Sequence, residues 1–289
     1  MKGGLQACSV TKEFLEDTYG TLKKMADYGY KYIESAGTMF TPELKVDMKE
    51  LKKMMDEVGI EHPSKHYCPY LTSDLNSEIE RLHIIGGDYL ALASDFFTSR
   101  DEVLSRCEMY NETGKICKEN GISFIYHNHA HEFQKFVDKS ALELLVENTD
   151  PEYVNFEIDT MWAFRGGDDP VETLKKFGKR VKLLHLDDFH PKYMDHRSFF
   201  DGLPENPVIT GEFYGQYNID VATDIGTGVM DVQSILDAAE KYTDVKYGFI
   251  ELSSANSRYK DDMMKAAEFG INQLKKYKGV SFEIGRAHV

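Results

Sequence analysis

Short apolar runs alternate with longer amphipathic stretches along almost the whole chain. The short runs have the length of buried strands, whereas the longer stretches repeat apolar residues at helical spacing. Strands are predicted at 5–10, 30–34, 60–67, 88–93, 122–128, 153–159, 181–186 and 246–252. Helices are predicted at 11–28, 41–59, 74–86, 99–119, 139–147, 169–177, 231–242 and 257–276. The chain therefore reads as eight strand-then-helix units in strict alternation.

This alternation predicts an α/β fold in which parallel strands are joined by crossover helices. Eight such units in 289 residues fit a (β/α)8 TIM barrel. A doubly wound open sheet is the alternative, but the first strand–helix turn has no Gly-x-Gly-x-x-Gly and the chain has no P-loop motif. We therefore expect a single barrel domain over residues 1–282, with an irregular insertion rich in Phe, Tyr, Asp, Pro and Gly at about 190–223.

The composition supports a folded protein and excludes some partners. Hydrophobic residues make up 42% of the chain and aromatic ones 12%, enough for a sizeable core. A net charge of −15 argues against nucleic acid, because phosphate binding needs a basic surface. No apolar run approaches the roughly 20 residues of a membrane span, and the polar start is not a signal peptide. We expect a cytoplasmic protein that binds neither nucleic acid nor a membrane.

Cysteines and the last residues add little to the site. Cys8, Cys68, Cys107 and Cys117 are scattered with no CxxC pair, which is typical of reduced thiols, although a catalytic one is not ruled out by spacing. Residues 283–289 look foreign, because they back-translate into the start of a widely used sequencing adapter. We expect a non-native tail there, and its histidine is left out of the site.

Polar residues gather where the predicted strands end. In a barrel of this kind, active-site residues lie at the C-terminal ends of the strands. His127 and His129 point to the same side of their strand, because strand side chains alternate. The strand-end residues are Glu34, Lys65 with His66, His127 with His129, Glu157 with Asp159, His185 with Asp187 and Asp188, and Glu251. Carboxylates and imidazoles mixed in this way predict a divalent metal site.

Several of these residues also have a purely structural interpretation. The stretch 122–133 could be a surface loop that happens to be rich in histidine. Glu34 could cap the next helix or pair with a lysine, and Asp159 could cap the turn that follows it. Asp187 and Asp188 could be a solvated loop pair.

His185 and Glu251 point to function more strongly. Each is the lone polar residue that closes an apolar run, Val-Lys-Leu-Leu-His and Tyr-Gly-Phe-Ile-Glu. Burying either one unpaired would cost several kcal/mol.

Five segments resemble motifs of the xylose-isomerase-like superfamily, the TIM barrels of sugar isomerases and epimerases that also include endonuclease IV. The resemblance runs from Gly4 to about Tyr277, and the order and spacing of the motifs carry it. The motifs are Tyr126-His127-Asn128-His129-x-x-Glu132-Phe133, Phe156-Glu157-Ile158-Asp159-Thr160-x-Trp162, Leu184-His185-Leu186-Asp187-Asp188, Gly226-Thr227-Gly228-Val229-Met230-Asp231 and Phe249-Ile250-Glu251.

The resemblance implies a metal site. In this superfamily one divalent ion, often manganese, is held by Glu, Asp, His and Glu from four strands. Asp159, His185 and Glu251 match the last three positions, and His127 stands where the first glutamate is expected. The implied ligands are therefore His127, Asp159, His185 and Glu251. The expected ion is Mn²⁺, with Zn²⁺, Co²⁺ or Mg²⁺ as alternatives.

The chemistry that such a site suits is proton abstraction next to a carbonyl, with the metal as Lewis acid. Epimerases of the superfamily exchange the proton between two glutamates on opposite faces, so His127 puts symmetric epimerisation in doubt. We expect the catalytic groups to be Glu251, His127, His129 and His66. Trp162 stands where many relatives carry a substrate-contacting histidine and could stack on a sugar. The expected substrate-binding residues are Trp162, Glu132, Lys65 and Glu34.

These features leave more than one function open. The leading hypothesis is a metal-dependent isomerase or epimerase of a keto-sugar or inosose. The alternative is a lyase that cleaves an oxidised (3-keto) C- or O-glycoside or dehydrates an inosose. A DNA-repair enzyme of the endonuclease IV type conflicts with the charge of −15, and a non-catalytic sugar-binding barrel would need a broken metal site.

The expected partner is a small sugar or glycoside. The sequence has no compact basic cluster, so an unphosphorylated substrate is favoured. Assembly as a homo-oligomer or with a small partner subunit is left open. The aromatic residues of the insertion could cover a bulky aglycone, dock such a subunit, or simply pack the loop; they are Phe199, Phe200, Phe213, Tyr214 and Tyr217.

Overall fold

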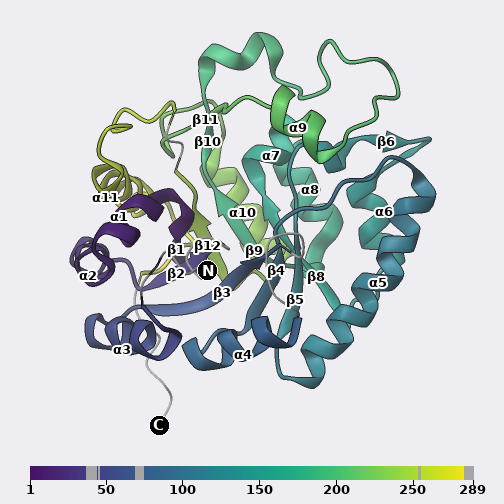
Figure 1. Cartoon of the computed structure of the whole chain (residues 1–289). Coiled ribbons are helices and arrows are strands. Elements are labelled where there is room, and N and C mark those ends of the chain that lie inside the picture. The colour runs from purple at the N-terminus through teal and green to yellow at the C-terminus, as the bar shows by residue number, and fades with distance from the viewer. Residues whose placement is uncertain (37–43, 45, 69–74, 253–254, 283–289) are drawn as a thin grey trace.

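The computed structural model describes residues 1–36, 44, 46–68, 75–252 and 255–282. Within these residues, eight parallel strands close into a barrel in the order β1-β12-β9-β8-β5-β4-β3-β2 (Figure 1). The strands are β1 (Lys2–Gln6), β2 (Tyr32–Ser35), β3 (Glu61–Tyr67), β4 (Tyr89–Leu92), β5 (Ser123–His127), β8 (Val154–Asp159), β9 (Val181–Leu186) and β12 (Tyr247–Ile250). The predicted TIM barrel is confirmed, and the open-sheet alternative is excluded by the pairing of β1 with both β2 and β12.

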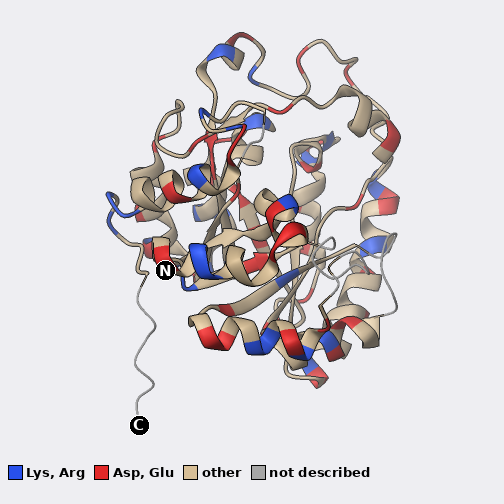
Figure 2. Cartoon of the chain, turned by 60° about the vertical axis from the view of Figure 1, so that its left-hand side comes forward, with Lys and Arg blue, Asp and Glu red and all other residues tan. Residues whose placement is uncertain are grey.

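Helices surround the barrel and cover the outer faces of the strands (Figure 1). They are α2 (Thr18–Tyr28), α3 (Met48–Val58), α4 (Leu75–Ile85), α5 (Arg100–Glu119), α6 (Ala141–Asn148), α8 (Pro170–Phe177), α10 (Val232–Tyr242) and α11 (Met263–Leu274). The main hydrophobic core lies between these helices and the strands, as parallel strands buried on both faces require. Acidic and basic residues are interspersed over the outer helices (Figure 2). Among the described residues, no helix has both the length and the apolar character that a membrane span requires.

Inside the barrel, an apolar layer lies below a polar one. The apolar layer consists of Tyr32, Ala91, Ile125, Leu183, Tyr247 and Phe249. Because strand side chains repeat on one face every second residue, the next inward position lies two residues further on. On four strands this next inward position is polar. The apolar residues and the polar ones that follow them are Tyr32 and Glu34, Ile125 and His127, Leu183 and His185, and Phe249 and Glu251. The strand register therefore places these polar side chains together at the C-terminal end of the barrel.

Three predicted helices have different limits in the structure. The helix predicted at 11–28 is divided into α1 (Thr11–Glu16) and α2, because Asp17 is extended and caps α2 by accepting a 2.9 Å hydrogen bond from Gly20 N. The helix predicted at 41–59 begins at Met48 after its cap Asp47, and the predicted start at 41–43 lies outside the described residues. The last helix begins at Met263 rather than 257, after its cap Asp262.

Some short elements were not predicted. Residues 7–10 form a 3-10 helix and do not extend the first strand, and α7 (Thr160–Arg165) follows β8 directly. Two small antiparallel pairs join β6 (Lys135–Phe136) to β7 (Lys139–Ser140) and β10 (Asp188–Phe189) to β11 (Ala222–Thr223). The predicted tail, 283–289, lies outside the described residues.

The insertion at 190–223 is more ordered than its composition suggests. It contains a 3-10 helix (Pro191–His196) and α9 (Gly211–Tyr217). Phe199 and Ile209 of the insertion are buried together with Ala130, which follows β5. Around these three pack Phe96, Trp162, Phe200, Leu203, Phe213, Tyr214 and Tyr217. The core of the insertion is therefore a small cluster that it shares with residues near the ends of the barrel strands.

Gly114 allows α5 to approach the backbone that precedes β8. A Cβ at this position would lie 2.2 Å from the carbonyl oxygen of Tyr153. Since backbone would have to shift, Gly114→Ala is expected to lower the free energy of unfolding by about 1–3 kcal/mol, although Ala is the better helix former. Gly215→Ala in α9 is the matched control: nothing lies within 4 Å of the added Cβ, so about 0.5–1 kcal/mol of stabilisation is expected. Urea denaturation of both variants tests this, and equal shifts of the same sign would contradict the close packing.

Candidate active site

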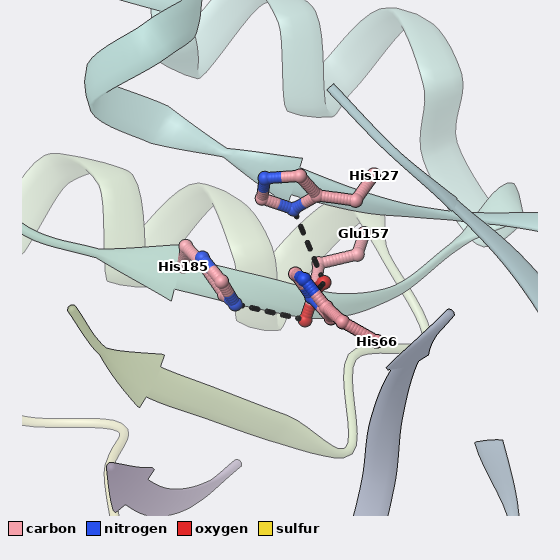
Figure 3. Close-up of side chains that lie close together, drawn as sticks. All are labelled: His66, His127, Glu157 and His185. Carbon is pink, nitrogen blue, oxygen red and sulfur yellow. Dashed lines mark hydrogen bonds and ion pairs between the residues drawn. The ribbon is translucent and has the colours of Figure 1, made fainter. Parts of the chain in front are cut away.

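Four buried side chains from four strands meet at the C-terminal end of the barrel: His66, His127, Glu157 and His185 (Figure 3). One ligand atom from each lies within 4.8 Å of the others. Oε2 of Glu157 accepts hydrogen bonds from His66 Nε2 at 2.8 Å and His127 Nδ1 at 3.1 Å. Oε1 of Glu157 lies 3.5 Å from His185 Nε2. We call these four residues the inner group.

Glu34 anchors the inner group from β2. Its Oε2 accepts hydrogen bonds from His185 Nε2 at 2.7 Å and Gln6 Nε2 at 2.8 Å, and lies 3.1 Å from His66 Nε2. The hydroxyl of Ser64 donates to Oε1. Although burial opposes the charged form, the imidazolium charges beside the carboxylate hold the pKa of Glu34 well below its usual range. Glu34 therefore fixes two histidine rings, and neither structural interpretation of it, a helix cap or a lysine pair, describes these contacts.

A second set of ligand atoms belongs to Asp159, His185 and Glu251, which we call the outer group. Nδ1 of His185 lies 2.9 Å from Oε2 of Glu251 and 3.7 Å from Oδ2 of Asp159. The ligand atoms of the three residues also lie within 4.8 Å of one another. The side chain of Glu251 is 34% exposed, whereas those of Asp159 and His185 are buried. The two nitrogens of His185 thus connect the inner group to a more open outer group.

The pKa values of the carboxylates in the outer group are shifted in opposite directions. Burial favours the neutral form of Glu251, but the hydrogen bond and charge of His185 outweigh it and lower the pKa of Glu251 to about 2. Burial raises the pKa of Asp159, and its contact with His185 only partly opposes this. Burial also raises the pKa of the neighbouring Asp187 well above its usual range. Glu251 is therefore the ionised carboxylate at the open side of the site.

The pKa values of the histidines are also shifted in opposite directions. Burial opposes the charged form of His66, but the carboxylates around it raise the pKa of His66 to about 10. Burial, reinforced by neighbouring imidazoles, lowers the pKa of His127 and of His129 well below the usual range. His127 and His129 are therefore neutral imidazoles.

The structure does not bring the four implied metal ligands into one group. His127 belongs to the inner group, whereas Asp159 and Glu251 belong to the outer group, and His185 belongs to both. His127 contacts Glu157 because these residues are register partners on the adjacent strands β5 and β8.

His129, Glu132 and Trp162 lie beside these groups. The ring of His129 lies 5.0 Å from that of His127 and 5.6 Å from that of Trp162. Buried Glu132 accepts hydrogen bonds from Tyr126 OH at 3.0 Å and His129 N at 2.8 Å, and burial raises its pKa to about 8. The backbone N of Trp162 donates to Oδ1 of Asp159 at 2.7 Å, so Asp159 is both a helix cap and a member of the outer group.

Two strand-end residues lie away from both groups. Lys65 is fully buried and pairs with Glu78 of α4, on the face of β3 opposite to His66. The expectation that Lys65 contributes to substrate binding is therefore not supported by its position. Asp188 is buried too, and its carboxylate accepts hydrogen bonds from the backbone N of Phe189, Gly226, Gly228 and Met230 at 2.8 to 3.1 Å. The solvated-pair interpretation of Asp187 and Asp188 is wrong, because both side chains are buried.

Sequence reasoning undervalued Glu157 and did not find two neighbours of the site. The sequence shows Glu157 as a strand-end residue but does not single it out as a potential ligand, although its spacing from Asp159 puts both side chains on one strand face. The two neighbours are Gln6, the last residue of β1, and Cys8, two residues further along the chain. Cys8 Sγ donates to Oε1 of Glu251 at 3.5 Å, and burial raises the pKa of its thiol. No pattern in the sequence distinguishes this cysteine from the other three.

The residues of both groups fit a divalent ion. Imidazole nitrogens and carboxylate oxygens together suit borderline ions such as Zn²⁺ and Mn²⁺. Oε1 of Glu157 and Oδ2 of Asp159 are buried and have no hydrogen-bond partner within the described ranges. Because buried polar atoms are normally paired, these oxygens are available to a ligand. The site could therefore bind a metal ion.

Comparisons with known proteins agree with this fold. A model of the xylose isomerase-like TIM barrel family matches residues 22–268. An inosose dehydratase of Mesomycoplasma hyopneumoniae (strain 7448) is 26% identical over 212 residues, 64% of this chain and 68% of that protein. A sugar phosphate isomerase/epimerase from Parabacteroides distasonis ATCC 8503 has a solved structure with a TM-score of 0.74 and 25% identity, over 97% of this chain and 96% of that one.

A further solved structure has a metal ion. The IOLI protein with a bound zinc atom is 16% identical, with a TM-score of 0.69, over 96% of this chain and 97% of that one. At this identity the likeness concerns the fold alone. With its closed barrel, its five motifs and a family match over most of its length, the chain belongs to the xylose isomerase-like TIM barrel family.

Proposed function

We propose that the protein is a divalent-metal-dependent enzyme that abstracts a proton next to the carbonyl of a keto-sugar or inosose, and that water is then eliminated. The observation that carries this is the outer group, in which an ionised and partly exposed Glu251 contacts His185 Nδ1 beside Asp159. An ionised carboxylate held at the open side of the site is free to accept a proton from the substrate.

The outer group is the better place for the ion. Asp159, His185 and Glu251 would hold it, and it would supply Lewis-acid polarisation of the carbonyl. Metal-binding histidines usually donate their other ring N–H to a carboxylate. Nε2 of His185 does so to Glu34, which Gln6 and Ser64 hold in turn. Glu34 thereby orients the His185 ring, whose Nδ1 faces the open side.

Elimination fits the asymmetry of the site. Glu251 would take the proton from the carbon next to the carbonyl, the bond from the adjacent carbon to its hydroxyl would break, and a carbon–carbon double bond would form. The departing hydroxyl and the abstracted proton leave together as water, so the single carboxylate is restored. The likeness to an inosose dehydratase supports this outcome.

Isomerisation or epimerisation is the second candidate. The Parabacteroides protein, a sugar phosphate isomerase/epimerase, matches nearly the whole chain at 25% identity. Returning the proton to another carbon or face needs a second acid, whereas burial and neighbouring imidazoles favour the neutral form of His127 and His129 by lowering the pKa of each. We also propose an unphosphorylated substrate, because Lys65 pairs with Glu78 and Arg165 binds backbone carbonyls.

Proton NMR in D2O tests this function. The Mn²⁺-loaded protein is incubated with inososes, ketoses, 3-keto-glycosides and their phosphates. We expect the proton signal of the carbon next to the carbonyl to disappear as a dehydrated product forms from an unphosphorylated inosose or keto-sugar. Deuterium exchange with a retained skeleton would favour the isomerase instead. Loss of an aglycone would favour the glycoside lyase, and equal turnover of a phosphorylated sugar would contradict the proposed substrate class.

A further inference from the structure

The insertion brings one phenol close to the site. Helix α9 lies on the same side of the barrel as β10 and α7 (Figure 1), and Thr210 caps it by accepting a 3.1 Å hydrogen bond from Phe213 N. From this helix, the ring of Tyr214 lies 5.9 Å from His129 and 4.8 Å from His131. Tyr214 is thus the member of α9 that contacts histidines of the stretch 127–131.

The ring of Tyr214 is held on several sides. It packs against Phe199 at 5.3 Å and Phe96 at 5.7 Å within the core of the insertion, and Trp162 lies 6.5 Å away. A ring held between aromatic neighbours has a fixed direction, so its hydroxyl is preorganised.

The hydroxyl of Tyr214 is buried and has no hydrogen-bond partner in the part of the chain that the structure describes. Burial and the carboxylates of Glu132, Asp159 and Glu251 raise the pKa of Tyr214, so the phenol remains a hydrogen-bond donor. Nδ1 of His129, the ring beside it, is also buried and without a partner among those residues.

These two orphaned groups require an explanation. A buried polar group left unpaired is destabilising, and phenylalanine would give the same ring contacts without that penalty. Tyr217, three residues further on the same helix, shows the usual arrangement: its hydroxyl donates to the backbone oxygen of Asp201 at 2.9 Å. A polar ligand beside the hydroxyl of Tyr214 would therefore supply the missing acceptor.

We propose that Tyr214 is a substrate-contacting residue whose hydroxyl donates a hydrogen bond to an oxygen of the bound sugar ring. The ligand class is an uncharged, polyhydroxylated six-membered ring. One face of the ring packs on Trp162, and its hydroxyl edge meets Tyr214 and His129. This assignment rests on the proposed function for the choice of a sugar, but the contact itself can be tested without turnover.

Tyr214→Phe and Tyr217→Phe form a matched pair for this test. Each removes one hydroxyl from α9 and keeps the ring. The chain has one tryptophan, Trp162, whose ring lies 6.5 Å from that of Tyr214, so its fluorescence reports on the surroundings of Tyr214. Wild type and both variants, loaded with Mn²⁺, are titrated with myo-inositol, and their thermal midpoints are measured without ligand.

We expect Tyr214→Phe to weaken myo-inositol binding about tenfold while its thermal midpoint stays equal or rises. Tyr217→Phe should bind normally and melt slightly earlier. Where turnover is found, Tyr214→Phe should mainly raise KM if the contact is equal in ground and transition states, and lower kcat if it strengthens during reaction.

Unchanged binding by Tyr214→Phe would overturn the inference. So would weaker binding accompanied by a fall in thermal midpoint like that of Tyr217→Phe, because the hydroxyl would then be structural. If myo-inositol does not change the fluorescence of the wild-type protein, the site beside Tyr214 does not bind the proposed ligand class. If binding depends on Tyr214 but no compound is turned over, the contact with Tyr214 is supported and the proposed reaction is contradicted.

Discussion

Asp159→Asn is expected to reduce the bound divalent metal to less than about a tenth of the wild-type content and to lower kcat/KM by about 10³-fold. Asparagine keeps the oxygen that accepts a hydrogen bond from Trp162 N, so α7 retains its cap. It removes the negative charge that Oδ2 directs towards His185 and Glu251. Loss of metal should therefore occur without loss of the fold.

The control for this variant is Asp169→Asn. Asp169 caps α8 through Val171 N at 2.8 Å and belongs to neither the inner nor the outer group. Both proteins are loaded with Mn²⁺, dialysed and analysed by mass spectrometry of the metal, and circular dichroism checks folding. A folded Asp159→Asn protein with full metal content would rule out the outer group and move the ion to the inner group.

Asp188→Ala is expected to lower the free energy of unfolding by about 3 kcal/mol or more. The carboxylate accepts hydrogen bonds from Phe189, Gly226, Gly228 and Met230, and each N–H left unpaired costs about 1–3 kcal/mol unless water reaches it. Gly228 approaches so closely that an added Cβ would lie 2.2 Å from Oδ1, so side chain and turn fit only together.

Asp231→Ala is the comparison for this variant. Asp231 is an exposed cap of α10 that accepts hydrogen bonds from the backbone N and the hydroxyl of Ser234. Its loss should cost about 0.5–2 kcal/mol. Urea denaturation of both variants measures the difference. A loss for Asp188→Ala no larger than that for Asp231→Ala would show that water satisfies the turn once the carboxylate is gone.

The barrel could be predicted because its signal is repeated. Each apolar run is followed by a helix, which indicates a parallel barrel. Because active sites of such barrels lie at the C-terminal ends of the strands, the polar residues at those ends become the candidate site residues. The predicted helix limits were wrong where a single side chain determines the local backbone conformation. Asp17 interrupts an amphipathic pattern that otherwise continues, because its carboxylate accepts a hydrogen bond from Gly20 N in the first turn of α2. Helix α7 has six residues, too few for a clear period.

The site was only partly predictable. Alternation along β3 already separates Lys65 from His66, so the direction of Lys65 was available from the sequence. The division of His127 from Asp159 was not, because it depends on the stagger between β5, β8 and β9. Nor could the sequence show that Glu34, 151 residues from His185, would hold that ring.

The small core of the insertion has a consequence for how this protein can change over generations. Phe199 and Ile209 are buried against Ala130, and neither belongs to the apolar layer inside the barrel. Mutations with independent effects on stability add up, whereas coupled ones do not. If Tyr214 contacts the substrate as proposed, substitutions in α9 can therefore change ligand preference over generations without altering that apolar layer.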